Sequence, residues 1–311
     1  MANYITISTI GTRHDLDPNQ APAEAVEEMI RLWQKELAQV FPERPDLIVL
    51  PEGSDGPLNF SQEKRKEYFQ ARGERIQNFL AQQAKTHSCY IAYSAIRILP
   101  DGTKRNSTII LDRQGGIAGI YDKNHLVIDE NTQSNILYGR EAPIIQCDFG
   151  TVACAICFDL NFHELRLQYV EAQPDLILFS SMYHGGLMQN YWAYSTRAYF
   201  VSAIAGLPSG IISPVGESIV SSNNHFHYVT GRVNLDCAVV HLDDNWEKLA
   251  TMKARYGPGV KVTDPGYLGA VLISSEMEEK TIQDLIAEFE LERIDEYFSR
   301  SLDHRQKNLE P

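Results

Sequence analysis

The stretch Thr151-Val152-Ala153-Cys154-Ala155-Ile156 is a mostly apolar run that ends at Cys157. Short apolar runs of this length predict a strand that is buried on both faces. A helical pattern over residues 163–172 follows it, and then a second apolar run over residues 175–179. This alternation of strand and helix favours an α/β fold, in which the two kinds of element form separate layers.

The same alternation continues in both directions from this stretch. Strands are expected over residues 4–10, 46–50, 89–99, 107–112, 117–122, 217–221 and 231–242, helices over 22–40 and 61–86, and either element over 195–205. Glycine and proline indicate an irregular loop over 245–267, and an amphipathic pattern predicts one helix over about 277–305. Because no linker-like stretch divides the middle of the chain, we expect one domain over 1–275 and a C-terminal helical extension over 276–311.

The composition is that of an ordinary globular protein, with 311 residues of which 43% are hydrophobic and 22% charged. The net charge is −13, and no basic cluster interrupts the acidic balance. An acidic surface repels phosphate groups, so nucleic acids and anionic membrane surfaces are not expected partners. No apolar run approaches the roughly 18 residues that would cross a bilayer.

The cysteines and the first residues indicate in which cellular compartment the protein is expected. There are five cysteines, an odd number, and their neighbours are apolar. Residues 1–7 have the pattern of a short strand and lack the basic start and apolar stretch of a signal peptide. We therefore expect free thiols in the reducing environment of the cytoplasm.

Three apolar strands end in chemically capable side chains. Glu52 follows residues 48–51, Lys123 follows 117–122, and Cys157 follows the opening stretch. In α/β folds, functional groups gather beyond the carboxyl ends of strands. A carboxylate, an ammonium and a thiol together suffice for acyl transfer: the sulfur attacks, the carboxylate moves the proton, and the ammonium stabilises the oxyanion. The base and the ammonium should also favour the Cys157 thiolate.

The sequence around these three residues resembles the nitrilase superfamily of carbon–nitrogen hydrolases. The matching segments occur in family order: Leu50-Pro51-Glu52, Tyr121-Asp122-Lys123-Asn124-His125-Leu126, Cys157-Phe158-Asp159-Leu160-Asn161-Phe162-His163-Glu164-Leu165-Arg166, Thr196-Arg197-Ala198 and Ser213-Pro214-Val215-Gly216. The resemblance covers about residues 4–243. It implies an α-β-β-α sandwich that pairs into homodimers or higher homo-oligomers, and thiol-based cleavage of a non-peptide carbon–nitrogen bond without a metal or an organic cofactor.

By the motif match, Cys157 is the nucleophile, Glu52 the general base and acid, and Lys123 the oxyanion group, with the backbone N–H of Phe158 completing the oxyanion hole. The resemblance also implies a second glutamate between the lysine and the cysteine. Glu130 is the preferred candidate. Glu141 is the alternative, but it follows Gly139, whereas the family's glycine normally follows the glutamate.

The residues after the cysteine narrow the range of substrates expected within the family. Phe158-Asp159 stands where nitrilases proper have Trp-Glu, and is closer to the amidase and carbamoylase branches. We therefore expect a small-molecule amide or carbamoyl substrate, with nitrile hydrolysis or acyl transfer to an amine as alternatives on the same residues. A catalytically silent binding or scaffold protein is the alternative of another class.

The remaining candidates are weaker. Tyr183 and His184 follow a predicted strand and are candidate pocket residues. Cys154 and Cys157 form a C-x-x-C pattern, but no second pair completes a zinc site, and we expect no metal. His225 and His227 have strand spacing and are more typical of a polar strand face. An apolar stripe in the tail is expected to contribute to a homodimer, with packing on its own subunit as the alternative; it comprises Ile282, Leu285, Phe289, Leu291, Ile294 and Phe298.

Overall fold

Two six-stranded β-sheets form the centre of the computed structural model, which describes residues 1–309. The first sheet has the order β12 (Tyr228–Asn234), β1 (Tyr4–Ile10), β2 (Leu47–Val49), β3 (Tyr90–Ile98), β4 (Lys104–Leu111) and β5 (Ile117–Asp122). The second has the order β11 (Ser218–Ser221), β10 (Gly210–Ile212), β9 (Tyr199–Ile204), β8 (Leu176–Ser181), β7 (Thr151–Ile156) and β6 (Ile145–Gln146). The strands β1–β3 and β7–β9 pair in parallel, and antiparallel strands extend both sets.

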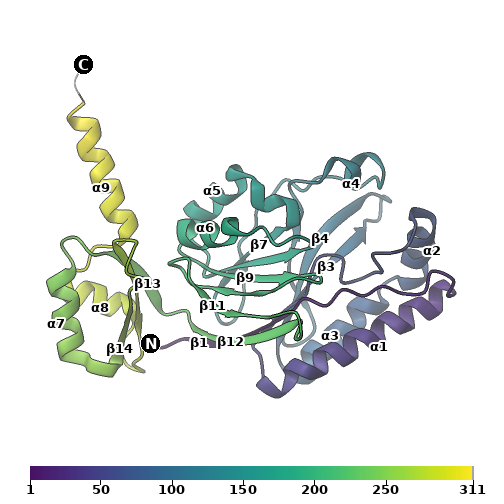
Figure 1. The fold of residues 1–311 in the computed structure, drawn as a ribbon, viewed down its shortest axis with the longest axis horizontal. Coiled ribbons are helices and arrows are strands. Elements are labelled where there is room, and N and C mark those ends of the chain that lie inside the picture. Colours follow the sequence, from purple (N-terminus) through teal and green to yellow (C-terminus); the bar gives the residue numbers. More distant parts are fainter. Residues whose placement is uncertain (310–311) are drawn as a thin grey trace. The chain divides into compact units, whose positions relative to one another are not determined.

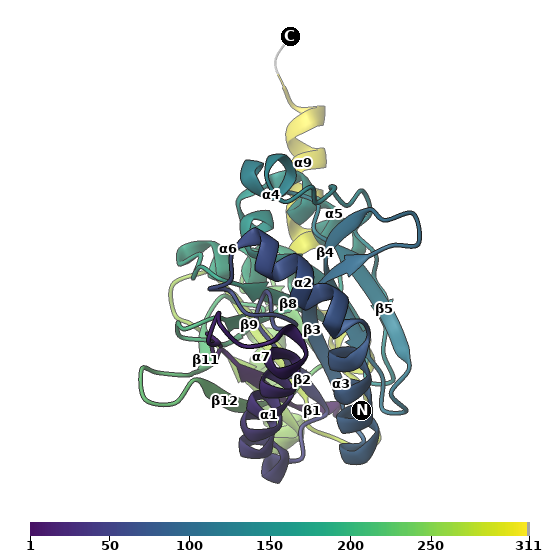
Figure 2. The same cartoon turned by 90° about the vertical axis from the view of Figure 1, so that its right-hand side faces the viewer.

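Helices cover the outer face of each sheet, so the layers run α-β-β-α (Figure 1). The first sheet carries α1 (Pro22–Val40), α2 (Gln62–Arg72) and α3 (Arg75–His87), which lie side by side in both ribbon views (Figure 2). The second carries α5 (His163–Ala172) and α6 (Leu187–Thr196). Short elements complete this part of the chain: α4 (Ile128–Thr132), and the 3₁₀ turns η1 (Phe41–Glu43) and η2 (Cys157–Asn161). The predicted α-β-β-α sandwich is confirmed.

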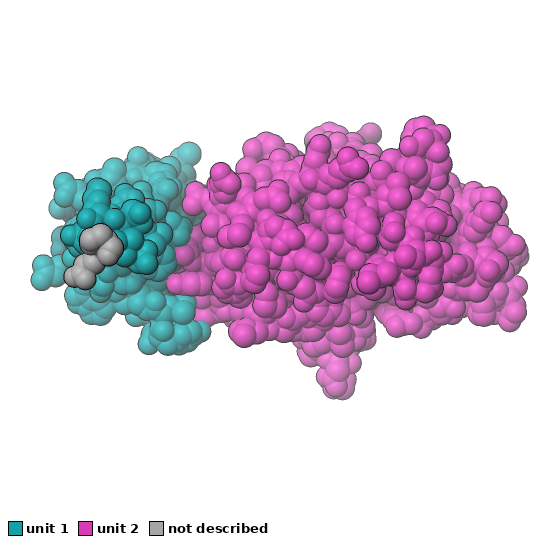
Figure 3. Space-filling view, turned by 90° about the horizontal axis from the view of Figure 1, so that it is seen from above, with its two compact units in different colours: residues 1–4, 233–311 teal, residues 5–232 magenta. Residues whose placement is uncertain are grey.

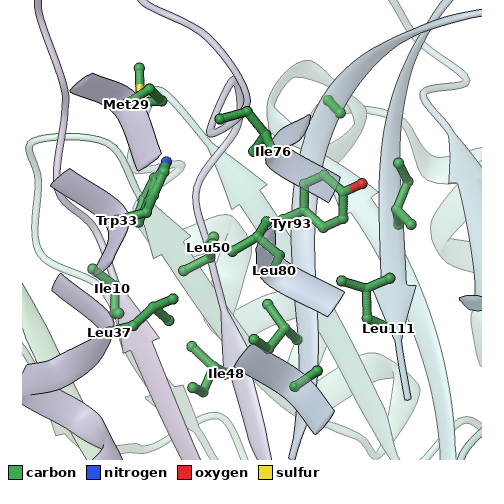
Figure 4. Close-up of a cluster of buried hydrophobic side chains, with 14 of the residues drawn as sticks. Ile10, Met29, Trp33, Leu37, Ile48, Leu50, Ile76, Leu80, Tyr93 and Leu111 are labelled. Carbon is green, nitrogen blue, oxygen red and sulfur yellow. The ribbon is translucent and has the colours of Figure 1, made fainter. Parts of the chain in front are cut away.

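An apolar core holds α1 and α3 against the first sheet. Met29, Trp33 and Leu37 project from one face of α1, and Ile76 and Leu80 from α3 (Figure 4). They meet strand residues including Ile10, Ile48, Leu50, Tyr93 and Leu111. The spacing of the α1 residues is that of one helical face, which explains why the sequence pattern located this helix correctly.

The chain divides into two compact units, coloured separately in Figure 3. The larger unit comprises residues 5–232, and the smaller comprises 1–4 and 233–311. The smaller unit has a three-stranded antiparallel sheet of the order β13 (Cys237–His241), β15 (Ala270–Ser275) and β14 (Val260–Thr263), with α7 (Trp246–Tyr256), η3 (Gly257–Gly259), α8 (Ile282–Phe289) and α9 (Ile294–Lys307). The boundary therefore lies at Val233, earlier than the predicted start of the extension at residue 276.

Several predicted elements are corrected by the structure. The irregular loop expected over 245–267 contains α7 and β14, and the helix expected over 277–305 is two helices. The helix expected over 61–86 is interrupted at Gly73, whose φ of 46° ends α2. The single strand expected over 231–242 is two strands, β12 and β13, in different sheets. Within residues 1–309, no helix has both the length and the apolar character needed to cross a bilayer.

Candidate active site

Glu52 lies just beyond the end of β2. The loop that carries it is tied to neighbouring elements: Trp33 Nε1 donates to the Ser54 carbonyl at 2.6 Å, and Ser54 Oγ donates to the Ser94 carbonyl at 3.0 Å. The strand itself is tied to the second sheet, because Ser180 Oγ donates to the Leu50 carbonyl at 2.8 Å. These contacts hold a carboxylate that is only 5% exposed at a defined position between the sheets.

Lys123 follows β5 and is 1% exposed. Its backbone N–H donates to the Asn106 carbonyl at 2.8 Å, which continues the pairing of β5 with β4. Its Nζ lies 2.9 Å from Glu52 Oε1 and 2.8 Å from Glu130 Oε2. Burying an ammonium is costly unless it is paired, and here two carboxylates share it.

Glu130 reaches Lys123 because α4 turns the chain back over the end of β5. Its Oε2 also accepts from the Val127 N–H at 2.8 Å, a hydrogen bond that caps the start of α4. Glu141 lies elsewhere: its side chain is exposed, and its carbonyl accepts from Asn124 Nδ2 at 2.9 Å. Of the two candidate glutamates, Glu130 is therefore the one that contacts Lys123.

Cys157 is at the junction between β7 and η2. Its φ of 47° lies in the left-handed region, which costs a non-glycine residue about 1–2 kcal/mol. This sharp turn takes the chain directly from a strand into a helical turn, as in other enzymes with an exposed nucleophile at the end of a strand. Phe158 is the second residue of η2, where backbone N–H groups have no partner within the turn.

Asp159 holds this junction in place. Its buried carboxylate accepts from the Ile156 N–H at 2.9 Å and from Tyr121 Oη at 2.7 Å. It also accepts from the His125 N–H at 2.8 Å and lies 3.0 Å from His125 Nδ1. Asp159 therefore connects the segment that carries the cysteine to both sides of the segment that carries Lys123.

The thiol is protonated near neutral pH, contrary to the expectation from sequence. Burial raises the pKa of Cys157 to about 11, and the neighbouring Glu52 carboxylate acts in the same direction. Lys123 and a backbone hydrogen bond from Met182 lower the pKa of the thiol, but by less. For Lys123 itself, burial opposes the charged form, but Glu52 and Glu130 raise its pKa above the ordinary value, so it remains an ammonium.

Asn106 is a residue of the site that the sequence analysis missed. Its Nδ2 lies 2.9 Å from Glu52 Oε1 and 3.0 Å from Glu130 Oε1, so it contacts the same two carboxylates as Lys123. It is 5% exposed and projects from β4. It lies among polar residues at the start of β4, ahead of the strand predicted over 107–112, so the local sequence pattern gave no signal that could have identified it.

These side chains line one cavity of about 420 Å³. Glu52, Asn106, Lys123, Glu130 and Cys157 all contribute to its wall. The remaining lining residues are the apolar or small residues Gly53, Gly56, Pro57, Leu58, Phe69, Ile96, Val127, Ile136 and Met182 and the polar residues Arg13, Asp55, Arg65 and Ser134. A thiol, a carboxylate and an ammonium that face one cavity can carry out acyl transfer on a small molecule.

Comparison with known proteins identifies the family of the chain. The family description "Carbon-nitrogen hydrolase" matches residues 16–241. The chain belongs to this family. No curated protein sequence matches significantly.

Solved structures of the nitrilase superfamily share the fold of this carbon–nitrogen hydrolase. Nit3 of Saccharomyces cerevisiae, a member of branch 10 of that superfamily, is 15% identical, with 75% of this chain and 90% of that chain covered and a TM-score of 0.62. The NitFhit protein of C. elegans is 17% identical, with coverage of 82% and 64% and a TM-score of 0.66. A variant of the Nesterenkonia sp. AN1 amidase, which carries the acetamide moiety of fluoroacetamide on its active-site cysteine, is 15% identical, with coverage of 74% and 90% and a TM-score of 0.61.

The predicted pocket residues of the hydrolase lie in different surroundings. The Phe158 ring packs edge-on against Phe162, 5.1 Å between centroids. Tyr183 packs on Phe179, and His184 is exposed and accepts from the Gly186 N–H at 3.1 Å through Nδ1. From the segment that follows β8, it is Met182 that lines the cavity among the described residues, not Tyr183 or His184.

The other candidate sites lie outside the lining of the catalytic cavity. Cys154 is fully buried within β7, and burial raises the pKa of its thiol far above the ordinary value. His225 and His227 are both exposed. Among the described residues, no three His, Cys, Asp or Glu side chains are grouped so that they could hold a metal ion.

Proposed function

We propose that this carbon–nitrogen hydrolase cleaves the amide or carbamoyl group of a small molecule through an acyl-enzyme on Cys157. The proposal depends on one observation above all: the thiol faces the same cavity as Lys123 and its two carboxylate partners, Glu52 and Glu130. The protonated resting thiol fits a mechanism in which the base removes the proton as the sulfur attacks. The covalent adduct on the cysteine of the Nesterenkonia amidase supports a nucleophilic role for the equivalent group here.

In the first half-reaction, the Cys157 sulfur bonds to the carbonyl carbon and its proton passes to Glu52. Glu52 Oε1 already accepts from Lys123 and Asn106, so we assign the proton to Oε2. Lys123 Nζ and the Phe158 N–H stabilise the negative charge that develops on the carbonyl oxygen. The carbon–nitrogen bond then breaks, and the nitrogen leaves with the proton held by Glu52.

In the second half-reaction, a water molecule attacks the thioester carbonyl. Glu52 accepts the water proton, and Glu130 orients the water and the substrate while keeping Lys123 charged. The carbon–sulfur bond breaks, and the sulfur recovers its proton from Glu52. The products are a carboxylic acid, or a carbamate from a carbamoyl substrate, together with ammonia or an amine, and no cofactor takes part.

A substrate panel tests the proposal. Wild-type protein and Cys157→Ala are incubated with simple amides, ureas and nitriles, and the release of ammonia and acid is measured. Hydrolysis of amides or ureas by the wild type alone is the expected result. Nitrile turnover, or acyl transfer to hydroxylamine at the expense of acid, would favour those alternatives. If none of the compounds is hydrolysed or used for acyl transfer, the result would favour a catalytically silent binding or scaffold protein.

We also propose that the enzyme works in the cytoplasm, because all five cysteines are free thiols. A homodimer or higher homo-oligomer that uses α9 is proposed as well. Most of the tail's apolar stripe is buried within the smaller unit, but Phe298 and Leu302 on α9 are 41% and 65% exposed. Light scattering of a Phe298→Glu/Leu302→Glu variant should show a lower mass than the wild type; an unchanged mass would contradict the involvement of α9.

A further inference from the structure

Among the described residues, Arg65 is the one cation lining the catalytic cavity that has no carboxylate partner. It lies in the first turns of α2 and lines both the catalytic cavity and an adjoining cavity of about 290 Å³. Phe69, Ile96, Ser134 and Ile136 line both cavities as well. Arg65 is therefore placed where a substrate that extends away from Cys157 would reach the adjoining cavity.

The other charged side chains of the catalytic cavity have counter-ions. Glu52 and Glu130 share Lys123, while Asp55 forms a buried ion pair with Arg72. Arg13 lies 3.3 Å from Asp15 and is exposed. Arg65 is therefore the unbalanced charge in the wall of the catalytic cavity.

The contacts of Arg65 satisfy only part of its guanidinium. Nη2 donates to the Leu58 carbonyl. Nε is buried and has no hydrogen-bond partner, and no carboxylate among residues 1–309 lies within ion-pair distance. Burial alone lowers the pKa of Arg65, which reflects a charge that has lost water without gaining an anion.

A guanidinium presents a planar fork of N–H donors, and a carboxylate matches that fork with two parallel hydrogen bonds. Apolar side chains, including Leu58, Phe69, Ile96 and Val127, line the same cavity as Arg65. We propose that the substrate carries a carboxylate that binds Arg65, joined by a short aliphatic segment to the amide or carbamoyl group that Cys157 attacks. This inference rests on the proposed function and adds the chemical class of the substrate.

The test compares matched substrates that differ only in the distal group. Glutaramic acid has a carboxylate where valeramide has a methyl group, and a ureido acid can be paired in the same way with its N-alkylurea. Wild type should prefer the carboxylated member of each pair by at least about tenfold in kcat/KM, the scale of a hydrogen bond to a charged group. Arg65→Gln should lower kcat/KM for glutaramate by roughly 10- to 100-fold, mainly through KM, and leave valeramide within about threefold.

Two further variants distinguish the effect of the planar donor pair of the guanidinium from the effect of a positive charge alone. Arg65→Lys keeps the charge but loses the planar donor pair, so its preference for glutaramate should fall between wild type and Arg65→Gln. Lys64→Gln removes the same charge from the preceding position of α2, where the side chain lines neither cavity, and should keep the wild-type preference. Thermal unfolding of each variant checks that α2 has remained folded.

A binding measurement makes the inference independent of turnover. Calorimetric titration of Cys157→Ala with glutaramate should give binding that is lost when Arg65→Gln is added to the same chain, and valeramide should show no such dependence. If Arg65→Gln does not fold, the role of Arg65 is still tested by the wild-type preference between the paired substrates and by the Arg65→Lys variant.

The failures can be told apart. If wild type hydrolyses no amide or urea at all, the proposed function itself is wrong. If wild type hydrolyses both members of each pair equally well, or Arg65→Gln lowers both equally, the function stands and the role of Arg65 is overturned.

Discussion

The catalytic site and the centre of the smaller unit contain different kinds of buried side chain. At the catalytic site, Lys123 is 1% exposed and lies within 2.9 Å of two carboxylates, both of which also accept from Asn106. The smaller unit has an apolar centre, in which Val240, Ile273 and Leu285 are fully buried. Buried charge networks are costly to form and contribute little net stability, whereas apolar burial is the main stabilising contribution to a fold.

This difference predicts a division of effects. Substitutions that keep the shape of the charged network but change its polarity should alter turnover strongly and stability weakly. Substitutions that open the apolar centre of the smaller unit should do the reverse. Each of the following measurements tests this division.

The largest effect is expected at Glu130. Glu130→Gln keeps the side-chain shape but removes the charge that Lys123 contacts, so turnover should fall by roughly 10²-fold or more, the scale of a lost acid–base contact. Glu141→Gln is the matched control, and it should have little effect because Glu141 is exposed and lies outside the catalytic cavity. Steady-state kinetics with the preferred amide measures both. Wild-type turnover in Glu130→Gln would remove the second carboxylate from the mechanism.

The residues that follow short apolar strands were predictable from sequence, because the strand pattern fixes where the chain reaches the edge of the sheet. Glu52, Lys123 and Cys157 were located in this way, with a family resemblance to assign their roles. Asn106 was missed because it lies among the polar residues at the start of β4, ahead of the predicted strand, and a local pattern does not reveal which carboxylates face it. Arg65 was missed for a similar reason, since the pattern of α2 does not show that its guanidinium has no counter-ion.

The smaller unit was predicted poorly for a different physical reason. Glycine and proline at 257–259 and 265–266 suggested that the whole segment 245–267 was irregular. In the structure residues 257–259 only end α7, where Gly257 has a φ of 52°, and β14 begins directly afterwards and ends before Pro265. Asn245 fixes the start of that helix from a distance, because its Nδ2 donates to the carbonyls of His241 and Glu292, and such contacts are absent from a local pattern.

The next effect concerns the pH dependence of alkylation at Cys157. A pKa raised to about 11 means that the thiolate fraction, and with it the rate of iodoacetamide labelling, should rise about tenfold per pH unit from about pH 8 to pH 10 without levelling off. An ordinary thiol, with a pKa of about 8.5, levels off within that range, and glutathione serves as the control. Peptide mapping should assign the label that inactivates the enzyme to Cys157. A plateau below about pH 8.5 would show that the resting thiol is not held protonated.

A smaller effect is expected at Asn106, which positions the two carboxylates. Asn106→Ala removes both of its hydrogen bonds to Glu52 and Glu130, so kcat should fall by about tenfold with little change in KM. Thermal unfolding of the variant gives the folded fraction separately, because a merely structural role would lower the amount of folded enzyme without lowering kcat per folded molecule. A normal kcat per folded molecule would make the contact incidental.

The smallest effect on turnover is expected in the smaller unit. Ile273 is fully buried on β15, the central strand of the three-stranded sheet, so Ile273→Ala should cost about 2–5 kcal/mol in the free energy of unfolding of that unit. The folded enzyme should keep its kcat, because the catalytic side chains all belong to the larger unit. Ile177→Ala is the matched comparison: Ile177 is equally buried, but it lies on β8, which pairs with the strand that ends at Cys157. Hydrogen exchange should therefore show increased opening in residues 233–309 for the first variant and in β7–β9 for the second. A loss of kcat in Ile273→Ala as large as that in Ile177→Ala would break the division, because it would mean that the apolar centre of the smaller unit also sets the geometry around the thiol.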